Sequence, residues 1–183
     1  RMLFVVCFFA HSESSRHRNF AFLVSEEAHY SYQKACSLLG LGSSNLYKVP
    51  AHPVSGAMDA VALEKLLGDA VAAGKRPFFV GCTAGTTVLG AFDPFLEVKK
   101  VVDEFNAGLE PRSEAGHPGL WMHVDGAWGG GALFSKRERA KVMAGAELAD
   151  SFCTNPHKLL GAPQQCCCFM TRHPNLIMQA NSA

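Results

Sequence analysis

Short apolar runs alternate along this chain with segments whose apolar residues recur at helical spacing. Apolar runs of strand length, bounded by turn-forming residues, are typical of buried strands. We therefore expect strands at Phe20–Val24, Leu46–Val49, Phe78–Cys82, Trp121–Val124, Ser151–Thr154 and Cys166–Met170. Between Asp59 and Gly74, apolar side chains fall at i, i+3, i+4, i+7 and i+8, so they share one face of a helix. These residues are Leu63, Leu66, Leu67, Ala70 and Val71.

Three further helices are expected from their boundary signals. Ser31–Leu39 has a helical pattern and stops at Gly40, while Ser135–Ala144 is a more polar helix candidate. Asp93 and Pro94 mark another helix start, since aspartate is favoured at the cap and proline in the first turn. Strands and helices therefore alternate along the chain. This order predicts an α/β fold with a parallel or mostly parallel sheet and helices on both faces.

Composition agrees with a folded domain and excludes several classes of protein. The 183 residues are 48% hydrophobic and 18% charged, which is typical of a globular chain and not of a disordered one. A formal net charge of +1, without a basic stripe interleaved with aromatics, argues against a nucleic-acid partner. The apolar segment Met2–Ala10 is too short to span a membrane, so we expect it in the core and expect no membrane partner. The polar segment Asn106–Gly119 is expected to be a surface loop.

Seven cysteines are spread along the chain without the spacing of a disulfide framework or a zinc site. Cys166, Cys167 and Cys168 are consecutive and fall in an expected strand, so we interpret them as reduced, buried thiols. Reduced thiols indicate a reducing, cytoplasmic compartment. A metal site formed by His157 and this trio is the weaker alternative, and no metal is expected.

Two short motifs carry candidate chemistry. Asn155-Pro156-His157-Lys158 places a lysine between largely apolar segments, and an amine held away from water loses its proton more easily and can attack a carbonyl. Asp125 follows an expected strand and opens a glycine-rich loop, where α/β proteins commonly bind ligands. Each residue also has a plain structural interpretation, Lys158 as a surface lysine and Asp125 as a turn or helix cap.

Four loops follow expected strands and would meet at one edge of the sheet: Ser25–Tyr30, Thr83–Asp93, Asp125–Gly131 and Asn155–Lys158. Taken together, they resemble the loops of the group II pyridoxal-phosphate-dependent amino-acid decarboxylases in order, spacing and local structure. The resemblance is nearest to the glutamate and cysteine sulfinate decarboxylase branch, through the Gly85–Pro94 run and the Asp-x-Ala-Trp-Gly-Gly form of the third loop. It implies a fold-type I, aspartate aminotransferase-like large domain with pyridoxal 5'-phosphate as cofactor. The implied activity is decarboxylation of glutamate, cysteine sulfinate or aspartate through a Schiff base.

The resemblance also implies roles for individual residues. Lys158 would form the Schiff base with the cofactor, and Asp125 would pair with its pyridine nitrogen. His29 and Ala127 would pack against opposite faces of the ring, with His29 near the reacting carbon and able to serve in proton transfer. Thr87 would lie beside the ring and the Asp125 side chain. The residues expected near the phosphate come from the last loop: Asn155 and His157.

The same resemblance predicts the surroundings of the site. Residues 1–183 would form the central portion of the cofactor-binding large domain, with an N-terminal segment and a C-terminal small domain outside this chain. The partners would be a small amino-acid substrate and a second copy of the protein in a homodimer. Two alternatives stay open: another fold-type I pyridoxal-phosphate enzyme, such as an aminotransferase or aldolase-like enzyme, and a non-catalytic paralogue that retains the fold. The sequence does not choose among the acidic substrates.

Overall fold

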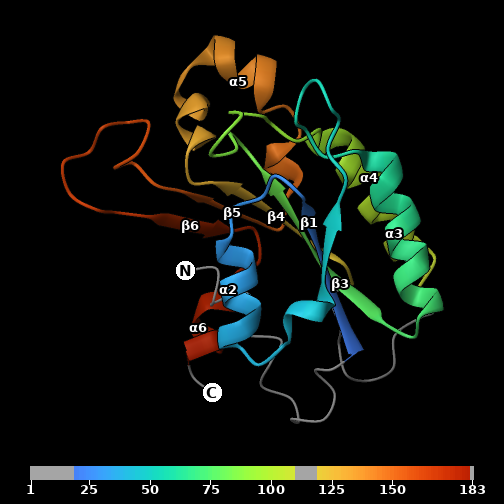
Figure 1. The fold of residues 1–183 in the computed structure, drawn as a ribbon. Helices are drawn as coiled ribbons and strands as arrows, with labels where there is room; N and C mark the ends of the chain where they lie inside the picture. Colours follow the sequence, from blue (N-terminus) through green and yellow to red (C-terminus); the bar gives the residue numbers. More distant parts are fainter. Residues whose placement is uncertain (1–18, 110–118, 182–183) are drawn as a thin grey trace.

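The computed structural model describes residues 19–109 and 119–181, whose strands form one six-stranded sheet (Figure 1). The strand order is β2-β1-β3-β4-β5-β6, and only the β5–β6 pair is antiparallel among these described strands. The expectation of a mostly parallel sheet is therefore confirmed. The strands are β1 (Phe20–Ser25), β2 (Leu46–Val49), β3 (Arg76–Thr83), β4 (Trp121–Gly126), β5 (Ser151–Thr154) and β6 (Cys168–Thr171).

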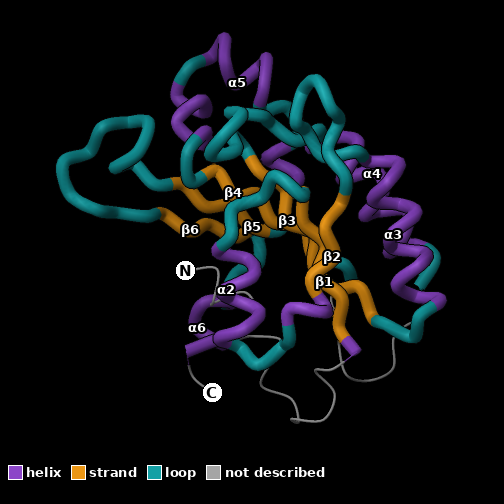
Figure 2. The backbone as a smooth tube through the Cα atoms, in the orientation of Figure 1, coloured by secondary structure: helices purple, strands orange, loops and turns teal. Residues whose placement is uncertain are grey.

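Helices cover both faces of the sheet, as the strand–helix order predicts (Figure 2). Helices α3 and α4 pack on one face, and α2 and α6 pack on the other. The α-helices are α2 (Ser31–Leu38), α3 (Ala60–Ala72), α4 (Phe95–Ala107), α5 (Lys136–Val142) and α6 (Leu176–Asn181). Short 3-10 helices are η2 (Ser43–Asn45), η3 (Gly129–Phe134) and η4 (Ala146–Leu148).

Alternation along the central strands explains why runs such as Ala21–Val24 are continuously apolar. In β1, Ala21 and Leu23 pack toward α3 and α4, whereas Phe22 and Val24 pack toward α2. Successive side chains of a strand point to opposite faces, so a strand covered on both faces is apolar at most positions. Each large apolar side chain buried in this way contributes about 1.5–3 kcal/mol. Leu63 of α3 is fully buried against this core, as its helical stripe predicts.

Asp93 does not cap α4, and the expectation that it would is wrong. Pro94 occupies the position before this helix, and no side chain caps its first turn. The Asp93 side chain is 3% exposed and accepts hydrogen bonds from the backbone N–H groups of Met58 (2.7 Å) and Thr83 (2.6 Å). The loop after β3 folds back so that the Asp93 N–H also donates to the Thr83 carbonyl. Burial raises the pKa of Asp93 to about 6, and the two backbone hydrogen bonds act against this rise.

The cysteine trio is less buried than its apolar surroundings suggest. Strand β6 begins only at Cys168, which is exposed, while Cys166 and Cys167 precede the strand and are half-buried. Because β6 is at the edge of the described sheet and alternates between exposed and half-buried positions, its residues gain little burial. The interpretation of the trio as core cysteines is therefore wrong. The expected core segment Met2–Ala10 lies outside the described residues, as does 110–118 of the expected loop.

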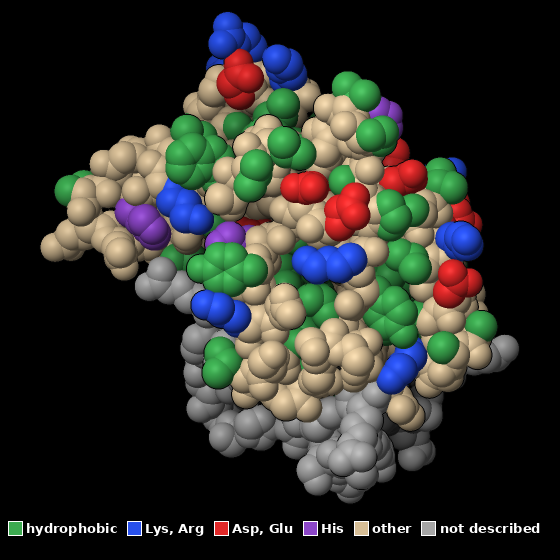
Figure 3. Space-filling view, in the orientation of Figure 1, with side chains coloured by type: hydrophobic (Ala, Val, Ile, Leu, Met, Phe, Trp, Pro, Cys, Tyr) green, Lys and Arg blue, Asp and Glu red, His purple; other side chains and the backbone are tan. Residues whose placement is uncertain are grey.

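Charged side chains of both signs are visible on one face of the described residues (Figure 3). On the face drawn in Figure 3, acidic and basic side chains are interspersed, with a basic group over α5. No helix within residues 19–109 or 119–181 is both long and apolar enough to cross a membrane.

Candidate functional site

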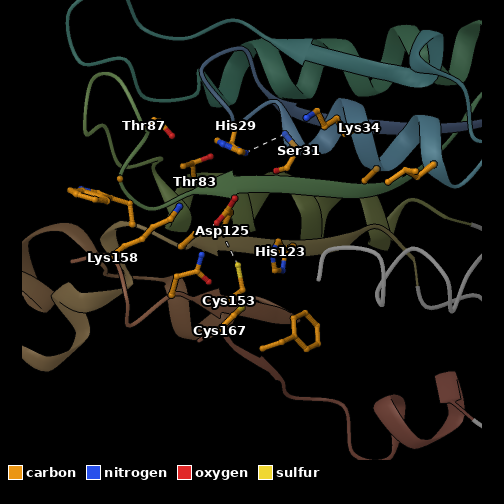
Figure 4. Close-up of a pocket in the computed structure, with 17 residues that line it drawn as sticks. His29, Ser31, Lys34, Thr83, Thr87, His123, Asp125, Cys153, Lys158 and Cys167 are labelled. Carbon is orange, nitrogen blue, oxygen red and sulfur yellow. Dashed lines mark hydrogen bonds between the residues drawn. The ribbon is translucent and has the colours of Figure 1, made fainter. Parts of the chain in front are cut away.

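A cavity of about 350 Å³ lies at the carboxyl ends of β3, β4 and β5, on the side of the sheet covered by α2 (Figure 4). All four loops selected from the sequence contribute to its wall, through His29, Thr87, Asp125 and Lys158. Loops that follow neighbouring parallel strands meet at one edge of a sheet, which explains this convergence. The structure therefore brings together side chains that are up to 129 positions apart, from His29 to Lys158.

One row of side chains crosses the sheet along the floor of the cavity. Thr83 of β3 is paired in register with Asp125 of β4, and Asp125 is paired with Cys153 of β5. The row continues to Phe169 of β6, which is paired with Cys153. All four residues line the cavity. Residues in register on adjacent strands point to the same face, so the sheet itself places Thr83 and Cys153 on either side of Asp125.

The Asp125 carboxylate is held through one of its two oxygens. Oδ1 accepts the backbone N–H of Ala127 at 3.0 Å and the thiol of Cys153 at 3.4 Å. Within the described residues both hydrogen bonds to this carboxylate go to Oδ1, which leaves Oδ2 available to a ligand. Ala127 also lines the cavity, so its small side chain lies where a planar group could approach closely.

Lys158 reaches the cavity from the turn after β5. Its backbone N–H donates to the Asn155 carbonyl at 2.9 Å, and in Figure 4 its amine end points toward Asp125. The side chain is half-buried, while Leu159 and Leu160 are 51% and 44% exposed. The expectation that apolar segments on both sides hold Lys158 away from water is therefore confirmed only for the segment before it, where Phe152 and Thr154 are buried.

His29 lies in the loop that enters α2. Its Nδ1 accepts the Ser31 backbone N–H at 3.2 Å, and its ring centroid is 4.2 Å from that of Tyr30. Because Nδ1 is an acceptor, a neutral ring carries its proton on Nε2. His29 thus both satisfies a backbone donor at the start of a helix and lines the cavity.

Thr83, the last residue of β3, and Thr87, in the loop that follows, differ in their relation to Asp125. Thr87 lines the cavity but is exposed, and it is Thr83 that lies opposite Asp125 in register. Thr83 is 4% exposed, and its buried Oγ1 has no hydrogen-bond partner among the described residues. A buried hydroxyl without a partner is costly, which marks this atom as a candidate ligand contact. The expected role of Thr87 beside the cofactor stays a prediction.

Of the two residues expected near a phosphate, only one lines the cavity. Asn155 lines the cavity, whereas His157 does not appear in its wall. The Nδ1 of His157 accepts the backbone N–H of Cys166 at 3.0 Å and so ties the loop between β5 and β6 to itself. Phosphate binding by either residue stays a prediction. Within the described residues, no group of three or more His, Cys, Asp or Glu side chains is arranged to hold a metal ion.

His123 is a cavity residue that the sequence did not single out. It is 1% exposed, with its ring between those of Phe79 and Phe169 at centroid distances of 6.0 and 6.1 Å. Its Nδ1 lies 2.8 Å from the Ser151 Oγ, which accepts the Trp121 indole N–H at 2.9 Å. Burial lowers the pKa of His123 to about 4, so the ring is neutral near neutral pH. The signal that could have identified it is its position two residues before Asp125 on the same strand face.

Close glycine contacts join the loops after β3 and β4. Gly85 has a φ of +81°, a conformation that side chains disfavour. Gly129 donates its N–H to the Ala84 carbonyl at 2.8 Å. A Cβ on Gly129 would lie 2.5 Å from the same carbonyl oxygen, so only glycine permits this approach. Gly129 therefore lets the loops after β3 and β4 pack against each other beside the cavity, whose wall includes Gly85 and Trp128.

Comparisons with known proteins agree with this geometry. The model of the pyridoxal-dependent decarboxylase conserved domain matches residues 11–183. The chain is 40% identical over 163 residues to the L-aspartate decarboxylase dtxS4 of Metarhizium robertsii, covering 89% of this chain and 30% of that protein. It is 38% identical over 157 residues to the glutamate decarboxylase of Drosophila melanogaster, covering 86% of this chain and 28% of that protein.

A solved structure shows the same fold. The crystal structure of mouse CSAD superposes with a TM-score of 0.84 at 32% sequence identity, covering all of this chain (100%) and 37% of that one. The chain thus spans between 28% and 37% of the length of these three proteins. Because the family model extends over nearly the whole sequence, this chain belongs to the pyridoxal-dependent decarboxylase family.

Proposed function

We propose that the protein containing this chain is a pyridoxal-phosphate-dependent decarboxylase that converts an acidic amino acid to the corresponding amine and carbon dioxide. The observation that carries the proposal is the single cavity into which three separate loops bring Lys158, Asp125 and His29. The relatives named for L-aspartate and glutamate support an acidic substrate, and cysteine sulfinate belongs to the same chemical class. Aspartate, glutamate and cysteine sulfinate are therefore the substrates to test.

The residues of the cavity fit this cofactor. They offer a primary amine on Lys158, a carboxylate oxygen of Asp125 without a partner among the described residues, and the buried, unpartnered hydroxyl of Thr83. When bound, pyridoxal phosphate supplies an aldehyde that condenses with amines and a pyridine ring that accepts the electron pair left by a departing carboxylate. Lys158 would hold the aldehyde end, and Asn155 and Thr87 are the remaining candidate contacts from the loops.

Asp125 would hold a proton on the pyridine nitrogen through its free Oδ2. A carboxylate fixed by the Ala127 N–H and the Cys153 thiol does not have to reorganise during the reaction. Charge placed in advance of the reaction stabilises the transition state more effectively than charge that must be recruited.

His29 would move a proton near the substrate carbon. Its Nδ1 is occupied by the Ser31 N–H, so Nε2 is the nitrogen that can give and take a proton. Histidine suits this task because its ordinary pKa is close to neutral. Ala127 would leave room for the opposite face of the ring.

The wider setting belongs to the same proposal. We place residues 1–183 in the central part of the large domain of a homodimer in a reducing, cytoplasmic compartment. The free cysteines of the described residues, including the half-buried Cys153, Cys166 and Cys167, support the reducing environment. The limited share of each relative that the chain covers supports further segments in the whole protein.

Carbon dioxide release by the complete protein tests the proposal. We expect release from at least one of L-aspartate, L-glutamate and L-cysteine sulfinate in the presence of pyridoxal phosphate. Borohydride reduction followed by peptide mapping should place the cofactor on Lys158. Cofactor trapped at Lys158 without release from any acid would indicate another pyridoxal-phosphate reaction, and absence of trapping would indicate a non-catalytic protein.

The chain offers a matched control for the trapping experiment. Lys34 on α2 lines the same cavity but comes from a different wall, over the Tyr30 ring at 4.6 Å. Lys158→Ala should abolish the reduced adduct, whereas Lys34→Ala should retain it. Adduct on Lys34 in the unchanged protein would overturn the assignment of the lysine.

A further inference from the structure

Cys153 is in direct contact with the carboxylate on which the proposed chemistry depends. The two residues are paired in register on β4 and β5, and the Cys153 Sγ lies 3.4 Å from the Asp125 Oδ1. Sulfur hydrogen bonds are longer than those of oxygen, so this separation is consistent with a thiol donating to a carboxylate. No sequence motif marks Cys153, because its neighbours in the chain are apolar or hydroxyl residues.

The thiol remains a donor at physiological pH. Burial raises the pKa of Cys153, and the nearby charge of Asp125 and the hydrogen bond to it raise the pKa further. The backbone N–H of Gly126, hydrogen-bonded to the sulfur, acts in the opposite direction but does not outweigh burial. The sulfur therefore keeps its proton and directs it at Asp125.

Strand packing leaves this contact little freedom. A Cβ on Gly126 would lie 2.8 Å from the Cys153 carbonyl oxygen and 2.5 Å from the Phe152 ring, so β4 and β5 approach each other more closely than side chains would allow. The other donor to Oδ1, the Ala127 N–H at 3.0 Å, belongs to the backbone that follows Asp125. One backbone group and one side chain from a neighbouring strand thus fix the same oxygen.

We propose that Cys153 is a positioning residue that orients Asp125, holding Oδ1 so that Oδ2 faces the ligand. The inference rests on the proposed function for the identity of that ligand, pyridoxal phosphate. Cys153 would strengthen cofactor binding only by orienting Asp125.

A double-mutant cycle on the complete protein tests this coupling. The measurement is the dissociation constant of pyridoxal phosphate from the apoprotein, for Cys153→Ala, Asp125→Ala and the double variant. Because a thiol is a weak donor, loss of its hydrogen bond in Cys153→Ala should weaken binding about 3- to 10-fold. The same change in the Asp125→Ala background should have no effect, and equal weakening in both backgrounds would show a packing role instead.

Two matched variants distinguish the effect of the hydrogen bond on affinity from the effect of side-chain volume. Cys153→Ser keeps a donor and should bind within about twofold of the unchanged protein, since hydroxyl and thiol donors both satisfy the carboxylate. Cys82→Ala removes a buried thiol of β3, on the opposite face of the sheet, and should leave cofactor affinity unchanged. Serine behaving like alanine at position 153 would overturn the proposal.

A measurement on the apoprotein distinguishes failure of this inference from failure of the proposed function. Burial and the Asp125 charge both raise the thiol pKa, and Asp125→Asn removes the charge, so Cys153 should react faster with iodoacetamide at mildly alkaline pH, as followed by peptide mass mapping. An unchanged alkylation rate would contradict the contact itself. If Asp125→Asn speeds alkylation but the unchanged protein releases no carbon dioxide, the contact between Cys153 and Asp125 stands and only the proposed decarboxylase activity is rejected.

Discussion

Two aspartates at the carboxyl edge of the same sheet have opposite surroundings. Asp93 is 3% exposed, and both of its oxygens accept backbone N–H groups, from Met58 and Thr83. Asp125 is half-buried, and both of its bonds within the described residues fall on Oδ1. A carboxylate with both oxygens occupied holds loops together, whereas one with a free oxygen facing a cavity can bind a ligand.

The comparison shows that residue type and loop position do not decide the role of a carboxylate. Asp125 lies near the end of the buried strand β4 and Asp93 in the loop after the buried strand β3, and aspartate caps helices and turns in many proteins. What separates them is the number of backbone donors within reach of each oxygen. Replacement by asparagine should therefore lower turnover at position 125 and lower the stability of the fold at position 93.

Asp125→Asn should give the largest effect, on turnover. The neutral amide keeps an oxygen for Ala127 and Cys153 but cannot balance a protonated pyridine nitrogen. Loss of such preorganised charge lowers the rate on the order of 10²- to 10³-fold. Stopped assays of carbon dioxide release measure this, with chemical denaturation as the control, where we expect a change below about 0.5 kcal/mol. Comparable losses of activity and stability would make Asp125 a structural residue.

Asp93→Asn should give the opposite result. One of the two backbone donors, on Met58 or Thr83, would face an amide N–H and lose its acceptor. A buried donor left without a partner costs about 1–3 kcal/mol, so the free energy of unfolding should fall by that amount. Turnover per folded molecule, corrected by active-site titration, should stay near that of the unchanged protein. A stable but inactive variant would place Asp93 in the site.

The pH dependence of stability should sharpen the contrast. Asp93 has its pKa raised to about 6, so below that pH the folded state takes up a proton before the unfolded state does, and stability rises as pH falls. His123 has its pKa lowered to about 4, so below pH 6.5 the unfolded state takes up a proton first, and stability falls. The two contributions oppose each other between about pH 6 and pH 4.

Without Asp93, the contribution of His123 to the pH dependence of stability should no longer be opposed. In Asp93→Asn, the free energy of unfolding should fall more steeply with decreasing pH in this range, by at most about 1.4 kcal/mol per pH unit. Denaturant titrations at a series of pH values measure the slope, and Asp93→Asn with His123→Gln should restore a flatter profile. Parallel profiles for the unchanged protein and Asp93→Asn would show that Asp93 does not titrate in this window.

Thr83→Val should give the smallest effect. Valine has the shape of threonine without the hydroxyl, so the variant removes a buried Oγ1 that has no partner in the described residues. The apoprotein should gain about 0.5–1.5 kcal/mol, while pyridoxal phosphate should bind about 2- to 5-fold more weakly if the hydroxyl meets the ligand. Thermal unfolding with and without cofactor measures both. Unchanged affinity would remove Thr83 from the ligand contacts.

Local sequence signals predicted most of the fold. The strands Leu46–Val49 and Ser151–Thr154 have the expected bounds, and the one-sided stripe between Asp59 and Gly74 predicted α3 because a buried helix face must repeat every three to four residues. The errors fall where burial depends on neighbours. Cys166 and Cys167 are apolar enough for a core strand, but they precede a strand at the edge of the described sheet.

The sequence by itself determined the family, the order of strands and helices, and the four loops from which Lys158, Asp125 and His29 come. Only the tertiary structure decided which side chains surround Asp125. Strand register places Thr83 and Cys153 beside it, and the path of the loop after β3 leaves Thr87 exposed and turns Asp93 inward. The physical reason is that periodicity reports the face on which a side chain lies, whereas its partners across the sheet depend on how distant strands align.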